Sequence, residues 1–126
     1  MNATDIISEK NPEKLRIIQE LVPGKQITLA HIIAAPDEIL YQKMGLNPEI
    51  DYNKSAIGII NVSPAETAVI LADVAMKASN ISLGFVDRFS GTLIVTGSVS
   101  NTKAAVEQCC DYAKKLGFEV CEVSQT

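Results

Sequence analysis

Aromatic residues are scarce in this sequence. Tryptophan is absent, and the aromatic residues together make up 5% of the 126 positions. Ligand pockets and surfaces that stack nucleic-acid bases rely on aromatic side chains, so both kinds of site are disfavoured. Basic residues are also few: 11 stand against 15 acidic residues, and no run rich in lysine and arginine occurs. A protein that follows a phosphate backbone needs such a run, so we expect no nucleic-acid partner.

Cysteines and long apolar runs are also limited. The three cysteines, Cys109, Cys110 and Cys121, are odd in number and lack the C-x-x-C spacing of redox or metal pairs. We therefore expect Cys109 and Cys110 to be thiols buried in a core, and the odd number of cysteines fits a reducing cytoplasm. The first ten residues lack the basic and apolar regions of a signal peptide. No apolar run approaches the roughly 20 residues that span a bilayer, so no membrane partner is expected.

The motifs of enzymes and of cofactor-binding proteins are missing as well. His31 is the only histidine, and it has no partner at the spacing of a catalytic triad or a zinc site, so we expect a structural or interface role. No glycine-rich phosphate loop occurs. Glu66 is interpreted as part of a helix cap and Asp73 as a surface residue. The sequence predicts no catalysis, no cofactor and no metal; a small enzyme is the least favoured alternative.

The centre of the chain, residues 56–97, is by contrast strongly apolar. Its pattern predicts a buried strand, a helix and a tight hairpin. These elements are the strand 56–62, the helix 64–79 and the hairpin strands 81–89 and 92–97.

The predicted helix at 64–79 has more apolar surface than one sheet can cover. It opens with Ser63-Pro64-Ala65-Glu66, which we interpret as a capping box with proline at the first helical position. Glu66, Asp73 and Lys77 are spaced i, i+7 and i+11 and form one narrow polar stripe on an otherwise apolar helix. A chain of this length has little left to cover the other sides, so we expect a neighbouring subunit to cover them.

Further elements flank this centre. They are a strand at 25–34, a short helix at 36–44 that Pro36 opens and Gly45 ends, an amphipathic helix at 100–116 and a strand at 118–123. Residues 1–14 are predicted as a flexible tail, 15–22 as a strand or a short helical turn, and 46–55 as a polar loop. From residue 56 the order β-α-β-β-α-β predicts a ferredoxin-like α+β fold, with an antiparallel sheet and helices on one face.

At the hairpin tip a functional interpretation competes with a structural one. The tip comprises Asp87, Arg88, Phe89, Ser90 and Gly91. A phenylalanine beside a charged pair is unusual for a simple turn. An ordinary loop whose Phe89 folds back onto the core explains the pattern equally well at this stage.

Three stretches of the sequence resemble a known family. They are RIIQELVPGKQITLAHIIA (16–34), SPAETAVILADVAMKAS (63–79) and GFVDRFSGTLIVTGSV (84–99). They resemble the circularly permuted bacterial microcompartment (BMC) shell proteins of the EutS and PduU types, from ethanolamine and propanediol compartments. The resemblance covers roughly residues 15–126, and SPAETA, AMKAS and RFSG lean toward the ethanolamine type.

The resemblance implies a particular fold and assembly. Residues 25–126 would be a BMC domain whose closing strand and short last helix have moved to the N-terminus, here 25–34 and 36–44. The subunit would form a homohexamer that tiles a shell with other shell proteins, in the bacterial cytoplasm. Lys77 matches the edge lysine through which hexamers meet. Ala34-Ala35 stands where the family often carries a basic residue.

The resemblance also implies a central pore. The tip 87–91 would lie where the pore loop of ordinary shell hexamers lies. Segment 15–22 would be the N-terminal strand, six copies of which form a small barrel that plugs one side of the pore. Its pore-capping residues would be Leu15, Ile17, Ile18, Gln19 and Glu20. We thus expect a structural shell subunit of an ethanolamine-type compartment with a plugged or gated pore. The alternative is a ferredoxin-like regulatory domain that binds a small molecule.

Overall fold

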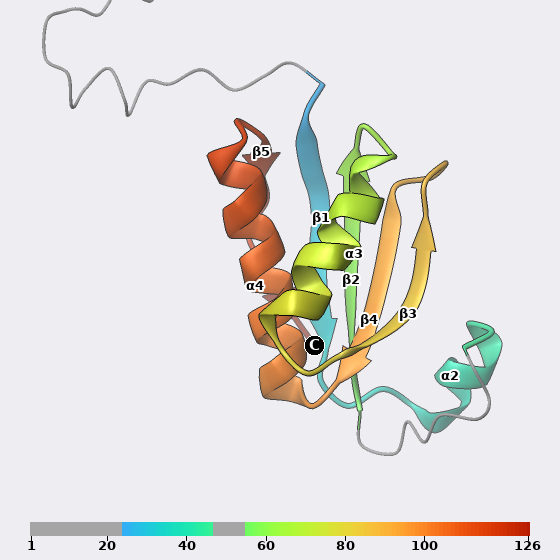
Figure 1. The fold of residues 1–126 in the computed structure, drawn as a ribbon. Helices are drawn as coiled ribbons and strands as arrows, with labels where there is room; N and C mark the ends of the chain where they lie inside the picture. The colour runs from blue at the N-terminus through green and yellow to red at the C-terminus, as the bar shows by residue number, and fades with distance from the viewer. Residues whose placement is uncertain (1–23, 47–54) are drawn as a thin grey trace, which may run out of the picture.

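The fold is one mixed sheet with two long helices on one of its faces (Figure 1). The computed structural model describes residues 24–46 and 55–126. The predicted tail 1–14, the barrel strand 15–22 and nearly all of the loop 46–55 lie outside the described residues. The elements are β1 (Gln26–Ile33), α2 (Glu38–Lys43), β2 (Ala56–Ser63), α3 (Thr67–Ala78), β3 (Ser82–Asp87), β4 (Thr92–Gly97), α4 (Val99–Lys115), β5 (Glu119–Val120) and β6 (Ser124–Gln125).

The strands follow the order β3-β4-β2-β1-β5, and β6 also pairs with β1. If the ferredoxin-like fold consisted only of the elements from residue 56 onward, its last strand, at the C-terminus, would lie beside β2. That place belongs to β1, which pairs antiparallel with β2 along its length. This arrangement agrees with the implied permutation, in which the closing strand precedes the rest of the domain. The C-terminal residues pair parallel on the outer edge of β1 instead.

The predicted strand 118–123 is wrong in its bounds, because the C-terminal strand is split into β5 and β6. The gap falls opposite an irregularity in β1 between Ile27 and Leu29. An irregularity of this kind turns backbone groups out of the ladder, so a neighbouring strand cannot pair continuously along it. The pairing continues at the C-terminus, where Thr126 N–H donates to the Ile32 carbonyl at 2.9 Å.

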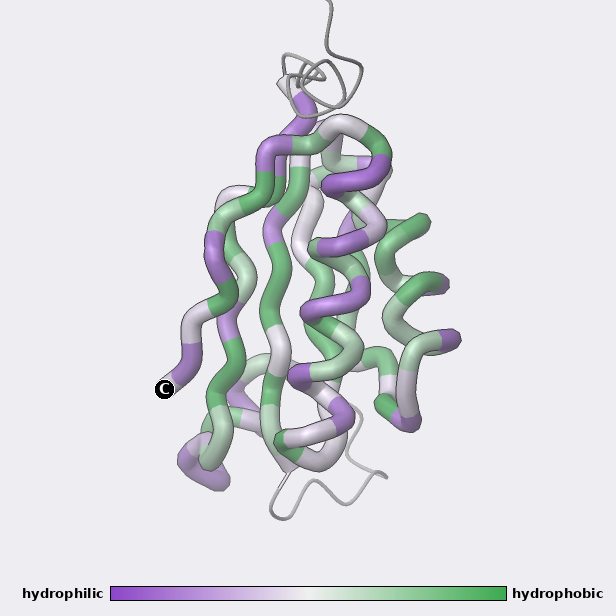
Figure 2. The backbone as a smooth tube through the Cα atoms, turned by 90° about the vertical axis from the view of Figure 1, so that its left-hand side faces the viewer, coloured by the Kyte–Doolittle hydropathy of each residue, from purple (hydrophilic) through white to green (hydrophobic). Residues whose placement is uncertain are grey.

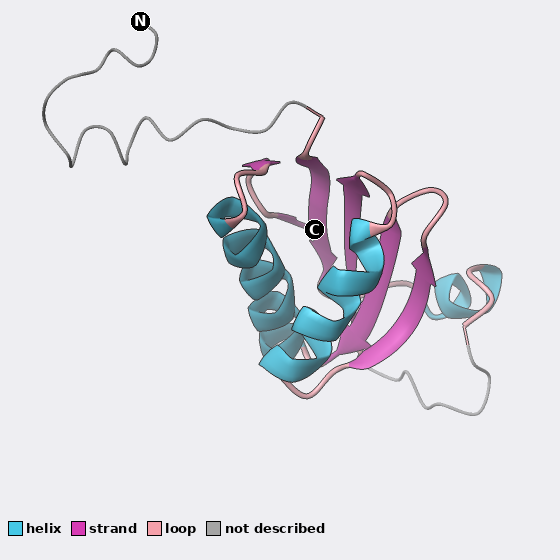
Figure 3. Ribbon diagram, turned by 45° about the horizontal axis from the view of Figure 1, so that its top comes forward, coloured by secondary structure: helices cyan, strands magenta, loops and turns pink. Residues whose placement is uncertain are grey.

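The main core lies between the sheet and the helices α3 and α4, which Figure 3 shows over the same face. The Cys109 thiol donates to the Leu71 carbonyl at 3.3 Å and so links the two helices. Burial raises the pKa of Cys109 to about 12 and that of Cys110 to about 11, so both thiols stay protonated at neutral pH. The prediction of core thiols is therefore confirmed for these two residues.

Helix α4 packs very closely on β2 at Gly58. A Cβ atom at this position would lie 2.9 Å from Cγ2 of both Thr102 and Val106. Gly58→Ala should therefore lower the free energy of unfolding by about 1–3 kcal/mol, since the core must move apart to admit the methyl group. Denaturant unfolding at matched protein concentration measures this loss. Ala104→Ser, on the exposed side of α4, serves as the control. Equal stability of Gly58→Ala and the control would contradict the close approach.

The predicted capping box before α3 is wrong. The helix begins at Thr67, and no side chain caps it. The backbone N–H groups of Thr67, Ala68 and Val69 each donate to the carbonyl three residues earlier, at 3.0–3.1 Å. A capping box would pair the Ser63 hydroxyl with the Glu66 N–H, but Ser63 is still part of β2 and the helix begins only at Thr67. The tight turn bonds satisfy the N–H groups at this later start, so the helix needs no side-chain cap there.

Helix α2 begins later than predicted. Asp37 is its cap and accepts the Ile39 N–H through Oδ1 at 3.1 Å, so Pro36 precedes the cap and is not the first helical residue.

Helix α4 begins one residue earlier than predicted, at Val99, because the Ser98 hydroxyl accepts the Asn101 N–H. Its end at Gly117, with φ +88°, agrees with the prediction.

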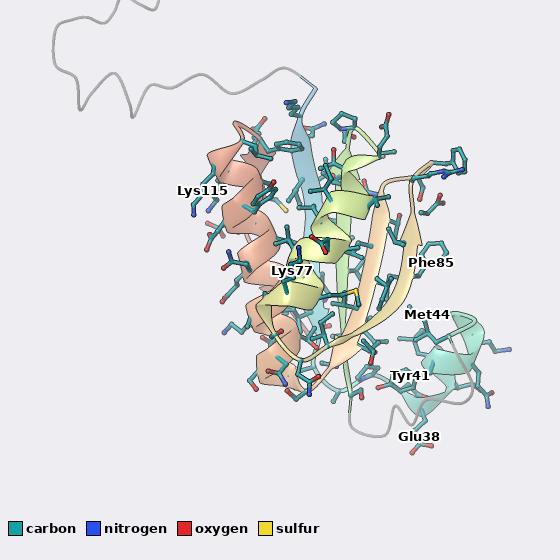
Figure 4. The ribbon with its side chains drawn as sticks, viewed as in Figure 1. Glu38, Tyr41, Met44, Lys77, Phe85 and Lys115 are labelled. Carbon is teal, nitrogen blue, oxygen red and sulfur yellow. The ribbon has the colours of Figure 1, made fainter. Side chains whose placement is uncertain are left out.

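Helix α2 covers part of the opposite face of the sheet. Tyr41 and Leu46 pack on Ile57, and the Tyr41 hydroxyl donates to the Ser55 carbonyl. Figure 4 shows Tyr41 of α2 and Met44, the residue just after this helix, beside the end of the sheet. The rest of this face is open: Leu29, which pairs with Asn61, and Phe85, which pairs with Ile94, remain exposed.

Candidate functional site

The outer face of α3 remains partly apolar and uncovered in the single chain. Val69, Ile70 and Met76 are 51%, 50% and 52% exposed, respectively. Figure 2 shows α3 as largely hydrophobic, with hydrophilic residues confined to its outer side, whereas α4 mixes the two. The predicted surplus of apolar helix surface is therefore confirmed. Burying one such side chain fully is worth about 1.5–3 kcal/mol, so this face favours contact with another surface.

Lys77 lies on this outer face, in the last turn of α3 (Figure 4). Its Nζ lies 2.8 Å from Oδ2 of Asp73, one turn earlier, and both side chains are exposed. The hydrogen bond to Asp73 raises the pKa of Lys77. Because exposed ion pairs contribute little to stability, the pair does not explain the position of Lys77 by itself. The lysine is accessible for a contact outside the chain.

The hairpin tip is longer than the predicted two-residue turn. Strand β3 ends at Asp87 and β4 begins at Thr92, so four residues connect them. The Asp87 side chain organises this connection: Oδ1 accepts the Phe89 N–H at 2.8 Å, and Oδ2 accepts the Ser90 hydroxyl at 2.9 Å. The Gly91 N–H donates to the Asp87 carbonyl at 2.9 Å. A short polar side chain that bonds the backbone two residues ahead is typical of such turns.

These hydrogen bonds lower the pKa of Asp87, and the bond from the Phe89 N–H contributes most. The carboxylate is therefore ionised at neutral pH. The pKa of Asp87 is lower in the folded protein than its ordinary value. Ionised Asp87 therefore stabilises the fold, and this stabilisation is fully present at a pH above the ordinary pKa. It is lost as the pH falls through the lowered pKa, so the tip should keep its shape at neutral and mildly acidic pH.

Arg88 and Phe89 lie on the outside of the tip. Phe89 is 80% exposed, so the alternative in which it folds back onto the core is wrong. The Arg88 guanidinium lies over the Phe89 ring, 5.0 Å from its centroid. Within ranges 24–46 and 55–126, no ion pair joins Arg88 to a carboxylate. The tip thus presents an aromatic ring and a cation to the surroundings.

The tip is fixed to the end of β2 by residues that the sequence analysis missed. The Val62 N–H donates to the Gly91 carbonyl at 2.9 Å, and the Asn61 side-chain amide donates to the Ser90 carbonyl at 3.3 Å. Asn61 is a polar residue inside the apolar run 56–62, and this interruption was the available signal. Gly91 has φ +79°, and a Cβ there would lie 2.1 Å from the Val62 carbonyl oxygen.

His31 connects β1 to the C-terminal residues. Its Nδ1 lies 2.6 Å from the Ser124 hydroxyl and its Nε2 lies 2.9 Å from the Thr126 hydroxyl. A catalytic Ser–His pair needs an acceptor such as a carboxylate on the second nitrogen, and a hydroxyl occupies that place here. The geometry agrees with the predicted structural role.

In the described part of the chain, no group of three or more histidine, cysteine or acidic residues is placed to hold a metal ion. None of the described helices is long and apolar enough to cross a membrane.

Comparison with known proteins gives consistent matches. The model of the BMC domain matches residues 56–124. The bacterial microcompartment shell protein EutS of Salmonella typhimurium is 46% identical over 114 residues, covering 90% of this chain and 98% of that protein. The shell protein PduU of Salmonella typhimurium is 40% identical over 119 residues, covering 94% and 99%. The solved CutR flat hexamer is 45% identical, covers 88% of this chain and 99% of that chain, and has a TM-score of 0.75.

Proposed function

Because the chain belongs to the BMC-domain family of bacterial microcompartment shell proteins, we propose that it forms homohexamers that tile the shell of an ethanolamine-type compartment. It is a structural shell protein of the EutS and PduU type. We expect it to work by assembly in the cytoplasm with other shell proteins of its compartment, without catalysis or a cofactor. Family membership favours this function over the alternative of a metabolite-binding regulatory domain.

The uncovered outer face of α3 is the observation that carries the hexamer proposal. Three large apolar side chains on one helix are half exposed in the single chain. A head-to-tail contact with the next subunit of a ring would remove these side chains from water. The solved CutR hexamer supports a six-subunit ring, because 99% of the CutR chain is matched by this one.

We place the tip, residues 87–91, at the pore of this ring. The exposed Arg88 and Phe89 support this assignment, since a simple turn does not need either side chain in water. The anchor of the tip to β2 supports it as well, because a pore loop has to keep one shape. The barrel strand 15–22 lies outside the described residues, and its pore-plugging role stays a prediction.

The compartment type needs a direct test, since the identities to EutS and CutR are similar. A fluorescent fusion of this chain can be expressed in cells that build either an ethanolamine or a propanediol compartment. We expect the fusion to be recruited into the ethanolamine-type particles and to remain diffuse in the other cells. Preferential recruitment to propanediol particles would contradict the ethanolamine assignment and leave the shell function intact.

Lys77 is proposed to join neighbouring hexamers. Lys77→Ala should leave the hexamer intact by size-exclusion chromatography with light scattering, and should strongly reduce sheet formation seen by electron microscopy. Lys115→Ala removes the same charge from the exposed end of α4, away from α3 in Figure 4, and should form sheets normally. Loss of the hexamer in Lys77→Ala, with Lys115→Ala unaffected, would show that Lys77 belongs to the subunit contact instead.

A further inference from the structure

We propose that six copies of Arg88 form a binding site for one small multivalent oxyanion on the axis of the hexamer. The inference rests on the proposed hexamer and on the proposed place of the tip at its pore. It assigns a ligand class to that pore: a small solute that carries two or more negative charges on phosphate or carboxylate oxygens.

The tip separates its two opposite charges. The Asp87 carboxylate is directed back into the turn, where it accepts the Phe89 N–H and the Ser90 hydroxyl. The Arg88 guanidinium lies on the outer side, against an exposed ring. Hence the charge on the outer side of the tip is positive, although the chain as a whole carries a net charge of -4. A local positive charge on a protein of negative net charge raises the concentration of anions at that one site.

Phe89 prepares Arg88 to bind. The guanidinium packs over the ring at 5.0 Å from its centroid, which restricts the long arginine side chain and leaves its N–H groups, in the guanidinium plane, free to donate. Arginine presents these donors in a planar fork that matches the oxygens of phosphate and carboxylate. Because the side chain is held before binding, less conformational freedom is lost when the anion arrives.

Symmetry turns a weak single site into a stronger shared one. Around a six-fold axis the like-charged guanidinium groups repel one another, and an anion on the axis relieves this repulsion for all six. A multivalent anion should therefore bind more tightly than a monovalent one. A primary amine such as ethanolamine is protonated at neutral pH, so the same ring repels it.

Isothermal titration of the full chain with pyrophosphate, in low salt, tests the inference. We expect one pyrophosphate bound per six chains, at least about tenfold weaker binding in Arg88→Gln because all six cations are lost, and weaker binding at high salt. Lys115→Gln removes the same charge from α4 and should bind as the unmodified chain does. Phe89→Leu keeps the charge and should weaken binding several-fold. Citrate should reproduce the one-to-six ratio if the site takes oxyanions in general; a failure of citrate restricts it to phosphates.

The outcomes separate this inference from the proposed function. Light scattering of the same samples reports whether the hexamer is present. A hexamer that binds no pyrophosphate, binds it at one per chain, or binds it equally well in Arg88→Gln overturns the anion site and leaves the shell function standing. Absence of the hexamer in the unmodified chain overturns the proposed ring and the inference with it.

Discussion

Replacing both Val69 and Met76 with glutamate should convert the hexamer into monomers. Both side chains are about half exposed in the single chain and lie on the same flank of the outer face of α3. If a neighbouring subunit covers them, the variant has to bury two unpaired carboxylates at each of six contacts. The effective penalty is several kcal/mol per buried ion, which exceeds what the contact gains. Glutamate is a good helix former, so α3 itself should persist.

Light scattering gives the mass of the variant, and circular dichroism verifies its fold. Ala104→Glu with Gln108→Glu adds the same two charges to exposed positions of α4 and should leave the hexamer unchanged. A variant that stays hexameric would exclude this flank from the subunit contact. The expectation is compatible with the edge role of Lys77, because residues 76 and 77 point about 100° apart around a helix.

Replacing Gly91 with alanine should disrupt the hairpin tip. The added Cβ would lie 2.1 Å from the backbone oxygen of Val62, which cannot rotate away as a side chain can. The backbone at Gly91 also has φ +79°, a conformation unfavourable for alanine. Together the clash and the strain should cost about 2–4 kcal/mol of unfolding free energy. The tip would have to separate from β2, so a pore built from it should also change.

Gly45→Ala separates the two causes. Gly45 has a similar backbone conformation, φ +70°, and among the described residues, apart from its two chain neighbours, no heavy atom lies within 4 Å of the position of its added Cβ. It should therefore show only the conformational cost, about 1 kcal/mol. Denaturant unfolding of both variants at matched concentration measures the difference. Equal losses in the two variants would contradict the contact between Gly91 and Val62.

Local patterns predicted most elements, and long-range contacts explain what they missed. Alternating or continuous apolar residues located β1, β2 and β4 closely, and the amphipathic pattern located α4. Sheet order could not be read from the order of elements, because β1 occupies the place beside β2 that a C-terminal strand would otherwise take. Only the family resemblance anticipated this exchange. The predicted capping box was wrong because Ser63 remains in β2 and the helix begins only at Thr67.

The candidate site was predictable where spacing along one helix decides it. The stripe with Asp73 and Lys77 and the apolar surface beside it follow from helical periodicity. The anchors of the tip do not, since Asn61 and Val62 lie about 30 residues from Ser90 and Gly91 in the chain. The partners of His31 are still more remote, at Ser124 and Thr126. No local signal connects residues so far apart.

Sedimentation velocity of the unmodified chain at micromolar concentration is the most direct test of this account. If α3 carries apolar surface that only another subunit can cover, one species with six times the mass of the chain should dominate, and dilution within the micromolar range should not dissociate it. A stable monomer with no concentration-dependent association would contradict the central claim.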